Sequence, residues 1–128
     1  MQALSGKGGD TVRDQVPRKI VAVFWDRGRA HWGDEVELGA LATGFKPGTS
    51  VKLSIFEAKN PEKSLKDLTA KLDDGRATAK WKLDFEDATV KHHETYRLFI
   101  LADASGVKSP AKLSPFLLCD VEPVRFSE

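Results

Sequence analysis

The stretch that decides the fold runs Gly33-Asp-Glu-Val-Glu-Leu-Gly-Ala-Leu-Ala-Thr-Gly-Phe-Lys-Pro-Gly-Thr-Ser-Val-Lys-Leu-Ser-Ile-Phe-Glu57. It contains two segments in which apolar and polar residues alternate. One side of the first segment carries Val36, Leu38, Ala40 and Ala42, and one side of the second carries Val51, Leu53 and Ile55. Successive side chains of a strand point to opposite faces, so each segment predicts a strand with one buried and one solvated face.

The residues between the two segments predict a turn, so the segments are expected to form a pair of strands. Pro47 presets φ for a turn, and Gly48 can adopt positive φ. A shift of the first strand by one residue would carry Glu35 and Glu37 into the core. We therefore expect a strongly fixed strand register.

Size and charge place the chain among single-domain proteins. A chain of 128 residues falls in the usual range of one domain and can bury a core without metal or disulfide staples. Lys and Arg number 20 against 19 Asp and Glu, so the net charge of +1 gives no electrostatic reason to expect nucleic acid or an anionic membrane as partner. Cys119 is the single cysteine, so no internal disulfide can form.

The ends of the chain differ from its middle. Residues 1–17 are polar, Gly-rich and without periodicity, and we expect a flexible or partner-ordered arm there. They lack the apolar run of a Sec signal peptide, and no stretch reaches the ~20 apolar residues of a membrane span. We expect cytoplasmic synthesis, with export only by another route or as part of a particle. The folded domain is expected over residues 18–122, with a tail at 123–128.

Further strands are predicted on both sides of the opening stretch. Residues 19–25 are β-branched and aromatic, which predicts a strand that is apolar on both faces. Residues 68–72 and 76–83 alternate around Asp73-Asp74-Gly75, which predicts a hairpin. Leu65, Leu68 and Leu72 also have helical spacing, but the hairpin signal is stronger, and it leaves at most one helical turn near residues 61–66.

The second half of the chain predicts another long strand and an edge segment. Residues 84–93 are polar and irregular, as in a connection that crosses between sheets. Residues 94–103 form a strand with Tyr96, Leu98, Ile100 and Ala102 inward. Residues 112–113 and 116–121 are predicted to form the last strand or strands. Pro110 and Pro115 interrupt this segment, and because proline cannot donate to a strand ladder, we expect the segment at a sheet edge. About seven strands with turns every 8–12 residues predict an all-β fold, an immunoglobulin-like β-sandwich of antiparallel strands.

Several of these segments together resemble a known family. They are Trp32-Gly-Asp-Glu-Val-Glu-Leu38, the turn from Gly44 to Gly48, the strand from Val51 to Glu57, and Leu72-Asp-Asp-Gly-Arg-Ala-Thr-Ala-Lys-Trp81. This text resembles the immunoglobulin-like modules of bacterial contractile-injection and type VI secretion proteins, of phage-tail-related proteins, and of proteins with peptidoglycan-binding modules. Tyr96 stands where immunoglobulin domains place a corner tyrosine. The resemblance implies a spacer, adaptor or contact module in a larger assembly.

No residue pattern predicts chemistry. His31, His92, His93 and Cys119 form the one conceivable metal set, but they lack metal-ligand spacing, so we interpret the histidines as solvated and Cys119 as a buried thiol. Asp73-Asp74 and Glu86-Asp87 lack the repeat of a calcium loop, and the first pair is explained by turn chemistry. We predict no catalytic, cofactor or metal site, and no enzyme.

Apolar residues on the outer face of the predicted sandwich are the remaining candidates for a site. Phe56, Phe99 and Leu101 occupy outward positions on neighbouring strands, and a contiguous apolar patch there would mark a protein interface, a second copy of the chain included. Coverage of these residues by the segments 1–17 or 120–128 is the alternative interpretation. A glycan- or peptidoglycan-binding module is the alternative function, with Trp25 and Trp32 as contact residues. Trp32 packed over the end of the sandwich is the simpler reading of that residue.

Overall fold

A computed structural model describes residues 17–84 and 94–121, and within these ranges the protein is built of strands, with no α-helix. No helix in the described part of the chain has the length and hydropathy needed to cross a bilayer. The strands are β1 (Lys19–Trp25), β2 (Arg29–His31), β3 (Glu35–Thr43), β4 (Ser50–Glu57), β5 (Lys66–Lys71), β6 (Arg76–Lys82), β7 (Glu94–Ala104), β8 (Val107–Lys108) and β9 (Leu117–Val121), with a 3₁₀ turn, η1, at Ala111–Leu113. The seven longer strands correspond to the predicted ones. The two further strands, β2 and β8, are very short and were not predicted.

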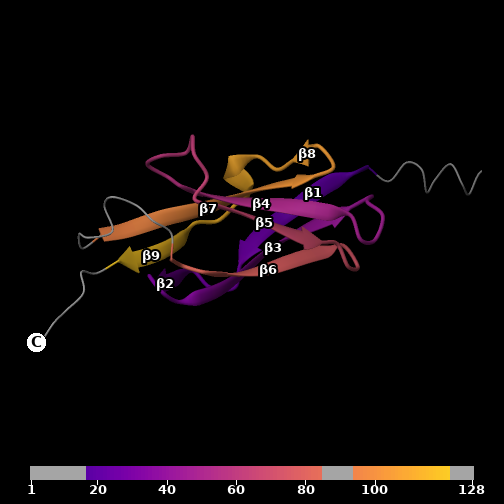
Figure 1. Cartoon of the computed structure of the whole chain (residues 1–128). Helices are drawn as coiled ribbons and strands as arrows, with labels where there is room; N and C mark the ends of the chain where they lie inside the picture. Colours follow the sequence, from indigo (N-terminus) through magenta and orange to yellow (C-terminus); the bar gives the residue numbers. More distant parts are fainter. Residues whose placement is uncertain (1–16, 85–93, 122–128) are drawn as a thin grey trace, which may run out of the picture.

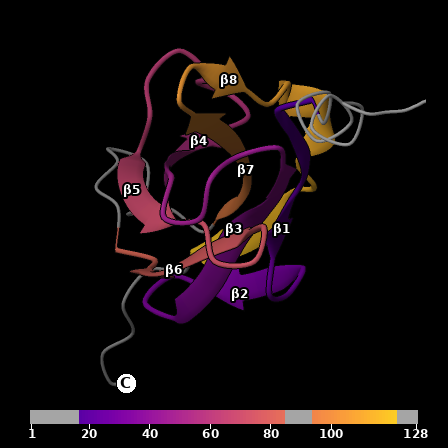
Figure 2. The same ribbon diagram turned by 90° about the vertical axis from the view of Figure 1, so that its right-hand side faces the viewer.

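The strands form two sheets that enclose one core (Figure 1). The smaller sheet has the order β1-β3-β6, and all its strands are antiparallel. The larger has the order β2-β9-β7-β4-β5, with β8 paired to β7, and it is antiparallel except for the parallel pair β2 and β9. The larger sheet is curled, so that in the view along the sandwich its two ends approach the smaller sheet (Figure 2).

The inward faces of both sheets are the ones that the alternating pattern predicts. The fully buried side chains include Leu38 and Val36 of β3, Val51, Leu53 and Ile55 of β4, Leu98 and Ile100 of β7, and Leu117 and Cys119 of β9. Burying apolar surface stabilises a fold by about 25 cal/mol per Å², so this shared interior is the main source of stability. The predicted inward and outward assignments for β3, β4 and β7 are confirmed.

One pairing prediction is wrong. The strands β3 and β4 do not hydrogen bond to each other, because β3 pairs with β1 and β6 whereas β4 pairs with β5 and β7. The turn through Pro47 and Gly48 carries the chain from one sheet to the other. Both strands bury their apolar faces in one interior, and two strands can do so either side by side or face to face. The period-two pattern is the same in the two arrangements.

The predicted hairpin at Asp73-Asp74-Gly75 is also changed by this arrangement. The turn itself forms, with Asp74 at φ 57° and Gly75 at φ 79°, and with Asp73 and Arg76 exchanging backbone hydrogen bonds of 2.9 and 3.2 Å. The two strands then diverge into different sheets. Next to the turn, the Leu72 N–H donates to the Thr49 carbonyl at 2.9 Å, extending the larger sheet, while the Ala42 N–H donates to the Gly75 carbonyl at 2.8 Å, extending the smaller one.

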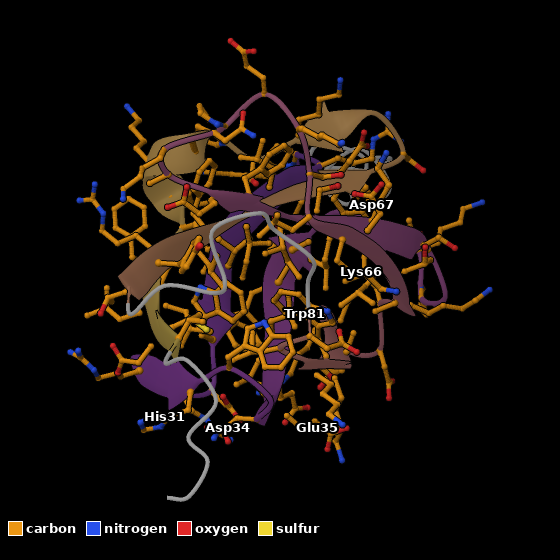
Figure 3. The ribbon with its side chains drawn as sticks, turned by 60° about the vertical axis from the view of Figure 1, so that its left-hand side comes forward. His31, Asp34, Glu35, Lys66, Asp67 and Trp81 are labelled. Atoms are coloured by element: carbon orange, nitrogen blue, oxygen red, sulfur yellow. The ribbon has the colours of Figure 1, made fainter. Side chains whose placement is uncertain are left out.

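Trp81 occupies the region where β5 and β6 diverge. It pairs with Val36 in the ladder between β3 and β6, and its side chain is buried. Figure 3 shows the indole ring below Lys66 and Asp67 of β5 and above Asp34 and Glu35 at the start of β3. Because β5 and β6 belong to different sheets, they separate beyond the turn, and the large side chain of Trp81 packs into the core at this boundary between the sheets.

The last strand is not at a sheet edge, contrary to the prediction. β9 lies between β2 and β7, and Lys112 and Leu113 belong to η1 and not to a strand. Pro110 and Pro115 both precede Leu117, so neither removes a donor from the β9 ladder. The three-residue strand β2 gives no alternating signal of its own, and for this reason the sequence does not reveal the neighbour that covers β9.

Two serines complete the edge of β7 where β9 no longer covers it. β9 pairs with β7 only as far as Leu98. Beyond that point the Ile100 N–H donates to the Ser114 hydroxyl at 2.9 Å, and the Ala102 N–H donates to the Ser109 hydroxyl at 2.8 Å. Both serines are buried, so their side chains take the place of a neighbouring strand for donors that water does not reach.

A glycine in β3 permits close packing on the outer face of the smaller sheet. Gly39 pairs with Phe24 on one side and Thr78 on the other, and the Phe24 ring lies across it. A Cβ atom at Gly39 would overlap the Ala77 carbonyl oxygen and would lie 2.7 Å from Phe24 Cζ. The Arg76 guanidinium covers the other part of the ring, at 4.8 Å from its centroid. Glycine in a strand interior here marks a close approach of a neighbouring group.

We expect Gly39→Ala to lower the free energy of unfolding by about 1–3 kcal/mol, the usual cost of an extra carbon in a packed site. Urea denaturation followed by tryptophan fluorescence measures the change. Gly28→Ala is the matched control, because nothing lies within 4 Å of a Cβ built at Gly28. Equal stabilities of the two variants would contradict the packing described for Phe24.

We expect Ser114→Ala to lower the free energy of unfolding by about 1–3 kcal/mol, because the buried Ile100 N–H then has no acceptor. Amide hydrogen exchange gives a local readout, with the Ile100 amide exchanging faster in the variant. Ser50→Ala, at an exposed position of β4, serves as control. Unchanged exchange at Ile100 would show that the hydroxyl does not hold this edge.

Candidate contact surface

The outer face of the larger sheet is a lattice of side chains in five rows, set by strand register. The register places side by side Lys108, Asp103, Lys52 and Thr69; then Leu101, Ser54 and Asp67; then Phe99 and Phe56; then Arg97, Leu118 and Arg29; and last Thr95, Asp120 and His31. Phe99 and Phe56, with Leu101 and Leu118 in the adjoining rows, form the centre of the face, and charged residues gather around this centre and at both ends. The face therefore contains two candidate features, an apolar one and a charged one.

The apolar feature is an aromatic patch, made of Phe56, Phe99, Leu101 and Phe116. The rings of Phe56 and Phe99 stack with centroids 5.5 Å apart, and Phe99 meets Phe116 edge to face at 6.2 Å. The Arg97 guanidinium lies 5.5 Å from the centroid of Phe116 on its other side. Offset and edge-to-face ring pairs are the preferred geometries of aromatic side chains, so the patch is an ordered surface.

The predicted outward residues are brought together as expected, but their exposure differs. β4 and β7 are neighbours, with Phe56 directly opposite Phe99 and Leu101 in the next row. Phe99 is only 8% exposed, whereas Phe56 and Leu101 are half-buried. The cover over Phe99 comes from Phe56 and Phe116; the segments 1–16 and 122–128, which the tail-coverage interpretation invokes, lie outside the described residues.

Phe116 is the member of the patch that the sequence prediction missed, and it is 47% exposed. The alternating pattern of the sequence does indicate that Phe116 faces outward. Leu117, Cys119 and Val121 alternate inward along β9, so the residue just before them points outward. Pro115 immediately precedes Phe116, and prolines next to a strand are typical of a sheet edge and not of an ordered contact surface.

A pocket of about 200 Å³ adjoins the patch at its β8 end. We name it the Leu101 pocket. Its lining residues are Lys52, Ser54, Phe56, Leu101, Ala102, Asp103, Lys108 and Ser109. The hollow exists because the short side chain of Ser54 stands between the longer side chains of Lys52 and Phe56 along β4. The charged lining residues, Lys52, Asp103 and Lys108, belong to one row of the lattice, and the apolar residues Leu101 and Phe56 belong to the next two rows.

The charged feature lies at the opposite end of the face. The Arg29 guanidinium donates to both carboxylate oxygens of Asp120, at 2.7 and 3.0 Å, and the Thr95 hydroxyl donates to the same carboxylate at 2.7 Å. The guanidinium, followed by the threonine hydroxyl, lowers the pKa of Asp120 to about 2. These contacts join β2, β9 and β7, so the cluster fastens the short strand β2 to the sheet.

The two tryptophans of the glycan-binding alternative have different environments. Trp25 is 9% exposed, and its indole N–H donates to the Pro115 carbonyl at 3.1 Å, so it offers little surface to a ligand. Trp32 is 43% exposed, at the end of the sandwich where its backbone N–H donates to the Asp120 carbonyl. The exposed pair of aromatic rings that this alternative needs is not formed by these two residues.

The residues considered for chemistry are separated or buried. Cys119 is fully buried, and burial raises the pKa of its thiol to about 12, so it is protonated at neutral pH. Within the described ranges, no group of three His, Cys, Asp or Glu residues could hold a metal ion. Asp73 and Asp74 form the turn described above, as predicted. His92, His93 and Glu86-Asp87 lie outside the described residues.

Comparison with known proteins gives little similarity. No protein-family model matches the chain, and no curated protein matches it. Among solved structures, the Pseudomonas fluorescens alkylpurine DNA glycosylase AlkC, bound to DNA containing an abasic site analog, matches 80% of this chain at a TM-score of 0.47 and 15% identity. The match spans 30% of the length of that chain. Similarity at this level establishes neither a shared fold nor a shared activity.

We expect Asp120→Asn to destabilise the protein at neutral pH and to have little effect near pH 2. An aspartate in an unfolded chain has a pKa of about 3.9. Because the folded-state pKa of Asp120 is lower, at about 2, its stabilising effect is complete above pH ~4 and disappears as the pH falls through ~2. Urea denaturation of both proteins from pH 7 to pH 2 measures the difference.

Asp67→Asn is the control for this experiment. Asp67 lies on the same outer face, but its side chain makes no ion pair or hydrogen bond with the described residues. A stability difference between wild type and Asp120→Asn that stays constant from pH 7 to pH 2 would contradict the assignment.

Proposed function

We propose that this chain is an immunoglobulin-like β-sandwich that serves as a non-catalytic protein-contact module. The strand order supports the first part of the proposal. If β1, β3 and β6 correspond to strands A, B and E, then β9, β7, β4 and β5 correspond to G, F, C and C′, which is how immunoglobulin-like domains divide their strands. The buried Tyr96 then lies on strand F, where such domains carry their corner tyrosine.

The observation that carries the function is the aromatic patch beside the Leu101 pocket. Single exposed apolar side chains are ordinary on a protein surface. Here three aromatic rings contact one another, the outermost is 47% exposed, and a pocket opens beside them. Aromatic anchors next to a pocket, with charged residues at the rim, are the usual composition of the energetically important part of a protein interface.

Several polar groups on or near this surface already have structural roles. Ser109 and Ser114 accept hydrogen bonds from β7, and Asp120 is held by Arg29 and Thr95. None of these groups remains for acid–base or nucleophilic work. This allocation favours a contact module over an enzyme.

We extend the proposal to the kind of assembly by the family resemblance. The residues that carry it form the beginning of β3, the turn before β4, β4 itself and β6. By that resemblance the module is a structural or adaptor component of a bacterial contractile-injection, type VI secretion or phage-tail-like assembly. Partner proteins are accordingly expected among the structural components of such a particle.

The test compares proteins captured by wild type with those captured by variants of the patch. Leu101→Asp and Phe116→Asp each introduce a carboxylate into the patch, at a half-buried position beside the pocket and at an exposed position, respectively. Phe99→Asp is unsuitable, because Phe99 is buried and its replacement would report on folding. Quantitative affinity capture from a lysate of the source organism measures the retained partners. We expect both variants to reduce capture at least tenfold, since interface anchors contribute 2 kcal/mol or more.

Leu41→Asp provides the matched control, since Leu41 is 36% exposed on the outer face of the other sheet. All variants are first shown to have wild-type thermal stability within a few degrees. The expected result is a set of proteins retained by wild type and Leu41→Asp and lost by both patch variants. Identical retained sets for all four proteins would overturn the proposed contact function.

A further inference from the structure

We propose that the Leu101 pocket binds an aliphatic side chain of a partner segment whose next residue is acidic, with the acidic carboxylate held by Lys52 and Lys108. This inference rests on the proposed contact function and specifies the chemistry of the partner. The experiment below separates a failure of the charge recognition from a failure of the contact function itself.

The size of the pocket fits a single side chain. Sites for cofactors and drug-sized ligands usually measure about 300–1,000 Å³, whereas this one measures about 200 Å³. It is also continuous with a protein surface that carries exposed aromatic rings, because Phe56 belongs to both the pocket and the aromatic patch. A pocket of this size beside such a patch is suited to one anchoring side chain of a protein partner.

The shape of the pocket selects an apolar anchor. Leu101 and Phe56 provide its apolar surface, and Ser54, which lies directly opposite Leu101 on β4, leaves the space between them open. Ser54 is itself nearly buried, so it presents little polar surface to a ligand. An aliphatic side chain that enters this space would exchange water for contact with Leu101 and Phe56.

The charged side chains that line the pocket, Lys52, Asp103 and Lys108, favour a carboxylate on the partner. Lys52 and Lys108 stand opposite Asp103 on its two sides, and together the three groups carry a net charge of +1. Asp103 already accepts the Gly106 N–H at 2.9 Å. Neither lysine has an ion pair within 4 Å among residues 17–84 and 94–121, and both are exposed. Two free ammonium groups beside an apolar pocket complement an apolar side chain followed by an acidic one.

The arrangement of the backbone requires the partner to lie across the face of the sheet. β4 is paired on both sides, with β5 and β7, so it offers no free edge near the pocket. The β7 edge beside the pocket is closed by Ser109 and Ser114, and Pro110 and Pro115 bring no donors. Addition of a strand is therefore excluded at β4 and at this part of β7, which favours recognition through side chains.

The probe is the peptide acetyl-Ser-Gly-Leu-Asp-Gly-Ser-amide, titrated into ¹⁵N-labelled protein and followed by two-dimensional NMR. We expect binding with a Kd of about 1 mM or somewhat tighter, as suits one anchor and one charge. The amides of Ser54, Leu101 and Lys108 should shift. Replacing the peptide leucine by serine should abolish binding, and replacing its aspartate by asparagine should weaken it about two- to fivefold.

Two protein variants test separately the lysines that would hold the carboxylate and the pocket that would hold the aliphatic side chain. Lys52→Gln with Lys108→Gln changes the local charge from +1 to −1, because Asp103 remains, and should weaken peptide binding about fivefold or more, with added salt no longer weakening it. Ser54→Val fills the pocket and should abolish binding. The control is Lys80→Gln with Lys82→Gln, which removes two exposed lysines from the other sheet and should leave peptide binding unchanged.

Each outcome decides the inference. Peptide shifts that respond to both pocket and lysine variants, together with loss of partner capture by the double lysine variant, support it. If the lysine variant captures partners like wild type while Leu101→Asp does not, the contact function stands and the acidic partner is overturned. Peptide shifts confined to other faces also overturn it. So does a Leu101-dependent dimer in sedimentation experiments, because the occupant is then a second copy.

Discussion

Burial of one face of every long strand in a single shared core is the constraint on which the rest of this structure depends. The inward residues of β3 lie across the interior from those of β4 and β7, and Leu38, Leu53 and Ile100 have no exposed surface. Neither sheet can be stable alone, because each would expose its apolar face. The turns near Pro47 and Asp74 therefore carry the chain between sheets, and Trp81 fills the seam that results.

The same constraint determines which residues remain for contact. Once the inward positions are filled, the outward positions of the larger sheet form a continuous lattice whose order is fixed by strand register. A charged group or an aromatic ring on this lattice cannot move to another row without moving the core. The aromatic patch, the Leu101 pocket and the Arg29–Asp120 cluster are consequently held at fixed separations on one face.

Different groups satisfy the hydrogen bonds of β9 and of β7 in the larger sheet. At one end the short strand β2 covers β9 and is fastened by the Arg29–Asp120 pair. At the other end two serine hydroxyls take the hydrogen bonds of β7 that no strand takes. Exposed strand edges invite pairing with other chains, so these devices limit strand addition at β9 and at β7. Beside the aromatic patch and the Leu101 pocket, which lie away from the outer edge of β5, this favours recognition of side chains over strand addition.

The sequence by itself determined which residues of the long strands face the core, because alternation has a period of two whatever the neighbouring strand is. It also determined the turn at Asp73-Asp74-Gly75, whereas the juxtaposition of Phe56 and Phe99 followed only from the sandwich topology expected for the whole chain. Tertiary structure alone decided that β3 and β4 lie in opposite sheets, that β9 is covered by β2, and that Phe99 is buried under Phe116. These features depend on contacts between segments far apart in the chain, and local periodicity contains no information about which strand lies beside another or which side chain covers it.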